Sequence, residues 1–303
     1  MAIRLGVVGW GEIARQHVRS FAAAGAELAA VVSRREYLVL DVPVHRSLDQ
    51  MLRQVDVVSI AVPNHLHART CLAAVDAGKP VMVEKPLLID RSELVQLEAA
   101  LADPPVPVHL GFRLRWNPSM LRLRARLRNV RSISCTYRLG IDELARDKDW
   151  TRELAITGGA FFTLGVHTLD LARWLAGCRG EPLAAVSASA NTRSSSADYP
   201  LHVSLRGTLP NGIEIAAGAD LSVERESTID LRVEAERGAY PDPELPPPTM
   251  QDEPVEYAAL IADFVRAVNT GTIDVTECRE VLQTHRELLD AREQSHAARR
   301  YAG

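Results

Sequence analysis

The first part of the chain alternates short apolar runs with stretches of helical periodicity. Five runs rich in Val and Ile, with few polar interruptions, predict strands that are buried on both faces. They span residues 3–8, 27–33, 56–62, 80–84 and 106–112. Helical patterns fill the intervals, at residues 11–24, 47–54, 64–78 and 90–102. This alternation is typical of a doubly wound parallel sheet, so we expect residues 1–118 to form one α/β domain.

The pattern changes after about residue 119. Five further runs, often with apolar alternation, predict strands at residues 130–139, 182–191, 201–209, 212–223 and 227–236. Pro210-Asn211-Gly212 predicts a hairpin turn, because Asn-Gly tolerates positive φ. Short connections of this kind favour a large, mostly antiparallel sheet. With a helix expected at 158–176, residues 119–303 are predicted to form a second α/β domain.

The last part of the chain contains a Pro-rich stretch, 241–254, that predicts a loop or linker. Two helical patterns follow, at 255–271 and 276–298, and we expect these closing helices to pack back on the first domain. One local conflict stands earlier, at 121–128. Its composition favours a helix, whereas its period of two favours a strand.

Composition and charge exclude several classes of protein. The 303 residues are 47% hydrophobic and 24% charged, which is typical of a globular chain of about two domains. The net charge of −4 argues against a nucleic-acid binder. No uninterrupted apolar run reaches the roughly 18 residues of a membrane span. The N-terminus enters a strand pattern at once, without room for a signal peptide, so we expect a cytoplasmic protein.

The arginines, the cysteines and the lysines add three observations. Seven arginines fall between Arg113 and Arg131 and are interpreted as a solvated charged face, with an anion site for a phosphorylated or nucleotide-linked substrate as the alternative. The four cysteines are far apart and without a C-x-x-C pair, which indicates reduced, buried thiols. Only three of 35 basic residues are lysines: Lys79, Lys85 and Lys148. Coding bias explains the excess of arginine, but a retained lysine also suits a role that needs a compact, titratable ammonium.

A glycine-rich turn follows the first predicted strand. Gly9-x-Gly11-x-x-Ala14 fits the dinucleotide fingerprint and stands where that motif requires, between a strand and a helix. Gly9 permits the tight turn, and Gly11 lets the backbone approach a pyrophosphate, whose charge meets the helix N-terminus. The alternative is a purely structural strand–helix turn.

The second predicted strand ends in Ser33, Arg34 and Arg35. An NAD enzyme usually has an acidic residue here for the ribose 2′-hydroxyl, whereas arginine binds a phosphate bidentately. We therefore predict a preference for NADP(H) over NAD(H). The alternative is that the arginines are merely exposed and that Glu36 serves NAD.

Further motifs together resemble one family. They are the P-N-H-x-H loop at 63–67, the A-G-K-P-V and E-K-P motifs at 77–86, and the segments 111–118, 149–152 and 158–170. In their order and spacing they resemble the Gfo/Idh/MocA oxidoreductases, the group of glucose–fructose oxidoreductase and inositol dehydrogenase. The resemblance covers nearly the whole chain and is weakest at 190–250.

The resemblance implies a Rossmann domain and a second domain that carries substrate contacts and the oligomer interface of a homodimer or homotetramer. The implied activity is hydride transfer between NADP(H) and a ring carbon of a sugar, amino sugar or cyclitol, with keto-reduction favoured. The active site is expected between the domains, at the carboxyl ends of the strands. The expected cofactor contacts are Gly9, Trp10, Gly11, Glu12, Ile13, Ser33, Arg34, Arg35, Ala61, Pro63, Asn64, His67, Glu84 and Lys85.

Two residues match the family's catalytic positions. Lys85 would hydrogen-bond the reacting oxygen and stabilise negative charge on it. His167 would exchange the proton of the substrate hydroxyl, although a histidine in an apolar helix is more often a core residue. The expected substrate contacts are Thr163, Asp170, Arg113 and Trp150, of which Asp170 better suits a packing partner. Lys79, in a turn, is expected to be structural, and a metal at His65-x-His67 is disfavoured because no further ligand lies at suitable spacing.

The chain departs from the family pattern at Thr163, where an aspartate usually stands one helical turn before the histidine. A threonine cannot accept a proton as a carboxylate does at pH 7. Tyr137, Asp149 and Tyr199 are alternative substitutes between which the sequence does not choose. The departure favours a reductase, and it leaves open a weakly active NADPH-binding regulatory or scaffold relative, or an imine or ketone reductase.

Overall fold

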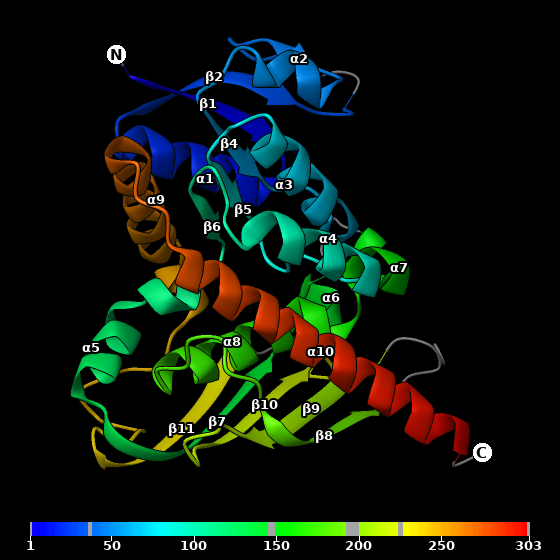
Figure 1. Cartoon of the computed structure of the whole chain (residues 1–303), viewed down its shortest axis with the longest axis vertical. Coiled ribbons are helices and arrows are strands. Elements are labelled where there is room, and N and C mark those ends of the chain that lie inside the picture. The colour runs from blue at the N-terminus through cyan, green and yellow to red at the C-terminus, as the bar shows by residue number, and fades with distance from the viewer. Residues whose placement is uncertain (1, 36–37, 145–148, 192–199, 224–226, 302–303) are drawn as a thin grey trace.

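The structure is a computed structural model that describes the chain except residues 1, 36–37, 145–148, 192–199, 224–226 and 302–303. Two sheets stand one above the other, and the helices α9 (Glu253–Thr270) and α10 (Val275–Tyr301) connect them (Figure 1). This agrees with the two α/β units expected from the sequence.

The first sheet has six parallel strands in the order β3-β2-β1-β4-β5-β6. Their bounds are Ile3–Val8 for β1, Ala26–Val32 for β2, Val44–His45 for β3, Val57–Ile60 for β4, Val81–Val83 for β5 and Val108–Leu110 for β6. The prediction missed β3 because two residues carry no periodicity. The strand order reverses between β1 and β4, which is where doubly wound sheets bind their ligands.

Four helices lie between these strands: α1 (Glu12–Ala23), α2 (Leu48–Leu52), α3 (His67–Asp76) and α4 (Arg91–Leu101). The helix predicted at 64–78 begins with a 3₁₀ turn, η1 (Asn64–Leu66). The start of α4 is fixed by Asp90, whose carboxylate accepts from the Ser92 amide while Glu93 reaches back in a capping box. Local chemistry thus determines this boundary.

The second sheet has five strands in the order β11-β7-β10-β9-β8. The bounds are Arg128–Arg138 for β7, Ala184–Asn191 for β8, His202–Thr208 for β9, Glu214–Asp220 for β10 and Thr228–Arg237 for β11. β10 runs parallel to β7, and the other three pairs are antiparallel, as mostly expected. Gly212, with φ +87°, turns the hairpin between β9 and β10.

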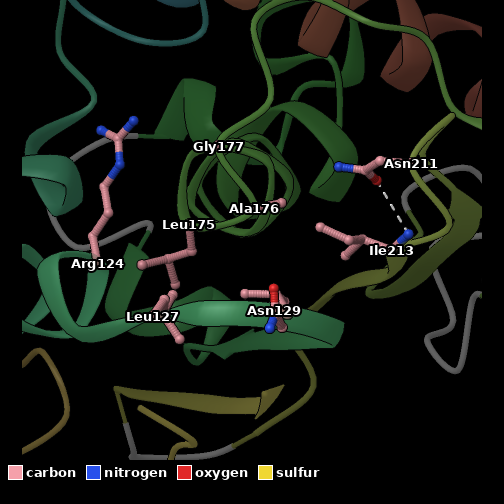
Figure 2. A pocket seen from close by; sticks show the side chains of 9 residues that line it. Arg124, Leu127, Asn129, Leu175, Ala176, Gly177, Asn211 and Ile213 are labelled. Carbon is pink, nitrogen blue, oxygen red and sulfur yellow. Dashed lines mark hydrogen bonds between the residues drawn. The ribbon is translucent and has the colours of Figure 1, made fainter. Parts of the chain in front are cut away.

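At residues 121–128, composition favours a helix and the period of two favours a strand. The structure has both in succession, the end of a helix and then the start of a strand. The short 3₁₀ helix η2 (Arg113–Trp116) leads to α5 (Pro118–Arg126), capped by Asn117, and β7 begins two residues later. Figure 2 shows Leu127 and Asn129 lining a shallow hollow together with Leu175 and Ala176 at the end of α8. The expectation of a solvated arginine face is wrong for Arg113 and Arg115, which are buried in ion pairs.

The helix predicted at 158–176 is divided. The short elements α6 (Ile141–Leu144), η3 (Asp149–Arg152) and α7 (Leu154–Thr157) precede Gly158 and Gly159, both with positive φ. A π-helical turn, η4 (Phe161–Gly165), then leads into α8 (Val166–Leu175). The stretch Leu154–Leu175 is long and apolar enough to cross a membrane, but 83% of its window is buried inside the protein, which is the signature of a core helix.

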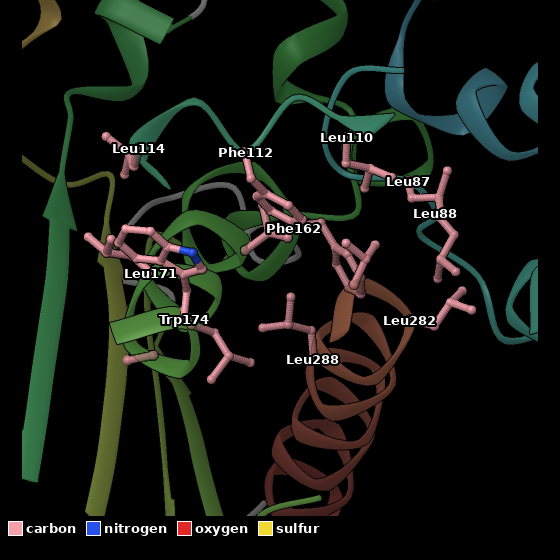
Figure 3. Packing of buried hydrophobic residues seen from close by; sticks show 14 of the residues in the cluster. Leu87, Leu88, Leu110, Phe112, Leu114, Phe162, Leu171, Trp174, Leu282 and Leu288 are labelled. Atoms are coloured by element: carbon pink, nitrogen blue, oxygen red, sulfur yellow. The ribbon is translucent and has the colours of Figure 1, made fainter. Parts of the chain in front are cut away.

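Two closing helices bind the domains together. After the 3₁₀ turn η5 (Met250–Asp252), α9 (Glu253–Thr270) packs against α1, and α10 (Val275–Tyr301) runs along α4, α8 and β8. Figure 3 shows Leu282 and Leu288 of α10 beside Phe162 and Leu171 of the second domain and Leu88 of the first. One hydrophobic core therefore continues from the first sheet to the second.

We expect a substitution in this shared core to destabilise both domains together. Leu288→Ala removes a side chain that is 1% exposed and should lower the free energy of unfolding by about 2–5 kcal/mol. Leu121→Ala, at a position 42% exposed on α5, is the matched control and should change it by less than about 0.5 kcal/mol. Urea unfolding followed by circular dichroism and tryptophan fluorescence measures both. Equal effects of the two substitutions would contradict the shared core.

Candidate functional site

The residue that follows each inner strand of the first sheet is a predicted site residue. Gly9 follows β1, Ser33 follows β2, Ala61 follows β4 and Glu84 follows β5. Since the strands are parallel, these residues meet at one edge of the sheet, which is the edge that the sequence predicts for the active site.

The turn between β1 and α1 fits a dinucleotide. Gly9 has φ +96°, and a Cβ there would lie 2.3 Å from the carbonyl oxygen of Ala61. A Cβ on Gly11 would meet open space, and α1 begins there without a side-chain cap. Its first amides are thus available to a pyrophosphate. Trp10 and Ile13 are half-buried beside this turn, and Glu12 is exposed in the first turn of the helix.

The end of β2 is basic. Arg34 and Arg35 are exposed, while the Ser33 hydroxyl is buried and accepts from the Arg35 amide at 3.2 Å. Burial, followed by the charges of Arg69 and then Arg34, lowers the pKa of His65. Arg34 and Arg69, which the sequence analysis did not single out, thus both act on His65, so this end of the first sheet carries positive charge that would attract a phosphate.

The loop after β4 joins the two domains. The Asn64 side-chain amide donates to the Thr157 carbonyl at 3.0 Å, beside the half-buried Pro63. The ring of His67 is 1% exposed and lies between the carbonyl oxygens of Pro86 (Nδ1, 2.6 Å) and Val62 (Nε2, 2.8 Å). This corrects the prediction of a cofactor contact by His67, because both ring nitrogens are occupied by backbone.

Glu84 is the centre of a buried polar network. Its Oε1 lies 3.1 Å from Nε2 of His17 and accepts from the Tyr257 hydroxyl at 2.9 Å, and its Oε2 accepts from the Lys85 amide at 3.3 Å. His17 Nδ1 also lies 2.8 Å from the Ser59 hydroxyl. Burial opposes the charge of Glu84, but the hydrogen bond and charge of His17 hold the pKa of Glu84 below its ordinary value. Both carboxylate oxygens of Glu84 are thus engaged by the protein, and Glu84 positions the turn that carries Lys85.

Lys85 contacts the helical segment that carries His167. The Lys85 ammonium donates to the carbonyl of Thr163 at 3.2 Å, one turn before His167. Burial, then Lys85, then Arg113 hold the pKa of His167 well below its ordinary value. Its Nδ1 is buried and has no hydrogen-bond partner among the described residues. The site therefore combines an ammonium group with a neutral imidazole.

Thr163 lies inside the π turn of η4, and its hydroxyl donates to the Gly159 carbonyl at 2.9 Å. Of the three alternative substitutes for the missing carboxylate, Tyr137 lies beside His167, with ring centroids 6.0 Å apart. Its hydroxyl donates to the sulfur of Met250 at 3.1 Å. Tyr199 and the side chain of Asp149 lie outside the described residues, as does Lys148.

Two predicted substrate contacts are ion-pair partners instead. Both oxygens of Asp170 accept from Arg115, at 2.6 and 2.9 Å, so the carboxylate is occupied. Arg113 is paired with Glu256 on α9, although its charge still reaches His167. Trp150 is half-buried on η3. Lys79 donates to the Val55 carbonyl, consistent with a structural turn.

The residues that the sequence did not reveal are His17, Ser59, Arg69 and Tyr257, each of which reaches the site from a distant element. Glu253 precedes Glu256 by three residues and Tyr257 by four, which places the two later residues near Glu253 on the helix, and this spacing is the signal that the sequence offers.

The chain was compared with known proteins. The rhizopine catabolism protein MocA of Rhizobium meliloti is 30% identical over 187 residues, 57% of each chain. An inositol 2-dehydrogenase of Saccharopolyspora erythraea is 30% identical over 190 residues, 58% of this chain and 55% of that protein. The chain thus matches little more than half the length of these relatives.

Two solved structures share the whole fold. GenD2 from gentamicin A biosynthesis, in complex with NAD, superposes with TM-score 0.84 at 22% identity and covers 98% of this chain and 95% of its own. Levoglucosan dehydrogenase with NADH and levoglucosan gives TM-score 0.83 at 19% identity, with 98% of both chains covered.

Family models cover both domains. The description "Oxidoreductase family, NAD-binding Rossmann fold" matches residues 3–112, and "GFO/IDH/MocA C-terminal domain" matches residues 125–240. On these two matches, which between them span most of the sequence, the chain belongs to the GFO/IDH/MocA oxidoreductase family.

Proposed function

We propose that this protein is an NADP(H)-dependent oxidoreductase that acts on a hydroxyl or keto group of a ring carbon in a sugar, amino sugar or cyclitol. The observation that carries the proposal is the contact of the Lys85 ammonium with the Thr163 carbonyl, one turn before His167, together with the influence of the Lys85 charge on His167. Inositol 2-dehydrogenase and levoglucosan dehydrogenase among its relatives support this substrate class. When bound, the nicotinamide supplies or accepts a hydride.

The protein's own residues handle the proton and the charge. Neutral His167 accepts the proton of a substrate hydroxyl as the C–H bond breaks, and returns it in the reverse direction. The Lys85 ammonium donates a hydrogen bond to the reacting oxygen and stabilises its negative charge. Thr163 favours keto-reduction because its hydroxyl cannot accept a proton at pH 7 as a carboxylate does. The neutral state of His167 favours oxidation, because a neutral imidazole can accept the proton of a substrate hydroxyl. Initial rates in the two directions decide between them.

Replacing either residue should abolish turnover without loss of nucleotide binding. Lys85→Ala and His167→Ala are each expected to lower kcat by about 10²–10⁴-fold, the usual contribution of acid–base and oxyanion-stabilising groups. Lys79→Ala is the matched control for lysine loss and should keep full activity. The assay follows nicotinamide absorbance with a panel of polyols, keto-sugars and keto-cyclitols. Full activity in both variants would end the assignment.

The departure at Thr163 supports a second function, a regulatory protein that binds NADPH with little catalysis. The hydroxyl of Thr163 donates to the Gly159 carbonyl. It therefore does not replace the aspartate that the family pattern has at this position. Tight NADPH binding with no turnover on the panel, including imines and linear ketones, would favour this alternative.

NADP(H) preference rests on the basic end of the cleft. Arg34 and Arg69 lie close enough to His65 to lower its pKa, so a 2′-phosphate there would gain two positive neighbours. The alternative is a preference for NAD(H), because two solved structures with the same fold hold NAD or NADH.

We expect Arg34→Ala to weaken NADPH by about 10–100-fold, the cost of losing a hydrogen bond to a charged group, and to change NADH by less than about twofold. Arg19→Ala, on the exposed side of α1, is the control and should alter neither. Fluorescence titration gives both dissociation constants. An unchanged NADPH/NADH ratio in Arg34→Ala would exclude the phosphate site.

A cytoplasmic location also remains a proposal. All four cysteines are free and buried, as is usual where thiols stay reduced.

We also propose a homodimer or homotetramer that forms through the second sheet. Helices α8 and α10 cover one face of this sheet. On the other face, Ser134, Thr136, Ser204 and Ala216 are half-buried, and such small side chains permit close approach of a second sheet.

Ala216→Arg should dissociate the oligomer, because it places a charge at the middle of this face. Light scattering after gel filtration should give a mass near 33.3 kDa for the variant and a multiple of it for the parent. Val39→Arg, at an exposed site on the first domain, should leave the oligomer intact. A monomeric parent would refute the proposal.

A further inference from the structure

The start of α9 lies over the candidate active site. Met250 contacts the Tyr137 hydroxyl at 3.1 Å and Arg113 at 3.6 Å, Glu256 pairs with Arg113, and Tyr257 donates to Glu84. Residues three and four apart share one face of a helix. Since Glu256 and Tyr257 both face the site, the residue that shares their face, Glu253, faces it too.

Charged groups of the site act on the carboxylate of Glu253. Arg113 of η2 and Lys85 after β5 lower its pKa, while Glu84 and Glu12 raise it. Burial is the largest influence, and the pKa of Glu253 ends above its ordinary value. Glu253 is only half-buried, so ligands can reach it. No hydrogen bond joins its carboxylate to another side chain in the part of the chain that the structure describes.

Two neighbouring carboxylates, those of Glu256 and Glu84, are already engaged by protein groups. Arg113 is neutralised by Glu256, and Glu84 is engaged by His17 and Tyr257. The Lys85 ammonium lowers the pKa of Glu253. Position 163, where the family pattern has an aspartate, holds a threonine.

We infer that Glu253 supplies the carboxylate that Thr163 does not, and accepts a hydrogen bond from a substrate hydroxyl next to the reacting carbon. This inference rests on the proposed function. The substrate is then a neutral polyhydroxylated ring, because a substrate carboxylate or phosphate at that position would be repelled by Glu253.

The test compares Glu253→Gln and Glu253→Asp with Glu27→Gln, a matched control at the opposite end of β2. Polyol binding to the nucleotide-loaded protein is measured by calorimetry, and kcat and KM are measured against pH. Glu253→Gln should weaken polyol binding or raise KM by about 10–100-fold, the loss expected for a hydrogen bond to a charged group. Glu253→Asp should lose less, and the nucleotide dissociation constant should stay within about twofold of the parent.

The pH dependence has a defined sign. Glu253 is a carboxylate above its raised pKa and neutral below it, so kcat/KM of the parent falls as pH decreases through that pKa. Glu253→Gln should lack this part of the acidic decrease, because a glutamine side chain does not titrate. Thr163→Asp added to Glu253→Gln should restore at least about tenfold of the lost kcat/KM, which a merely structural role of Glu253 does not predict.

The outcomes separate the two proposals. Polyol binding without turnover in the parent contradicts the proposed function and leaves the inference supported if Glu253→Gln loses that binding. Turnover in the parent with Glu253→Gln indistinguishable from Glu27→Gln overturns the inference alone. Failure of the parent to bind any polyol overturns both.

Discussion

The arrangement of the site depends on one buried carboxylate, that of Glu84. A charged group in this position requires partners, because an unpaired buried charge costs several kcal/mol. The partners come from three elements: His17 from α1, Tyr257 from α9 and the Lys85 amide from the turn after β5. Gly111 leaves room for it, since a Cβ there would lie 2.5 Å from Oε1. The need to satisfy Glu84 therefore fixes the closing helix against the sheet and holds the lysine turn.

The electrostatics of the cleft follow from that arrangement. Burial, followed by the charges of Lys85 and Arg113, holds the pKa of His167 well below its ordinary value, while the hydroxyl of Thr163 donates to the Gly159 carbonyl. A family site with an aspartate at position 163 would place a negative charge within the same helical turn as the histidine. In this chain we infer that the negative charge comes from Glu253 on α9, so that another element would serve the same chemistry.

The sequence predicted the parallel sheet and the residues at its carboxyl edge because strands buried on both faces are continuous apolar runs, and the turns after them carry distinctive motifs. It could not predict β3, which is too short for a period, nor the division of the helix at 158–176, where Gly158 and Gly159 take positive φ. The pairing of Arg115 with Asp170 was equally inaccessible, since partners 55 residues apart meet only in the folded chain. The motif of His67 predicts a cofactor contact, whereas both of its ring nitrogens lie against backbone carbonyl oxygens.

The core shared by α8, α10 and both sheets has a consequence for how the molecule responds to its ligands. Domains that unfold as one cooperative unit transmit binding free energy to every part of that unit, because a ligand held only by the native state stabilises whatever unfolds with it. A nucleotide bound at the turn after β1 would thus slow hydrogen exchange in β7 and β10, which it does not touch. Cofactor supply would in this way govern the lifetime of the whole folded chain.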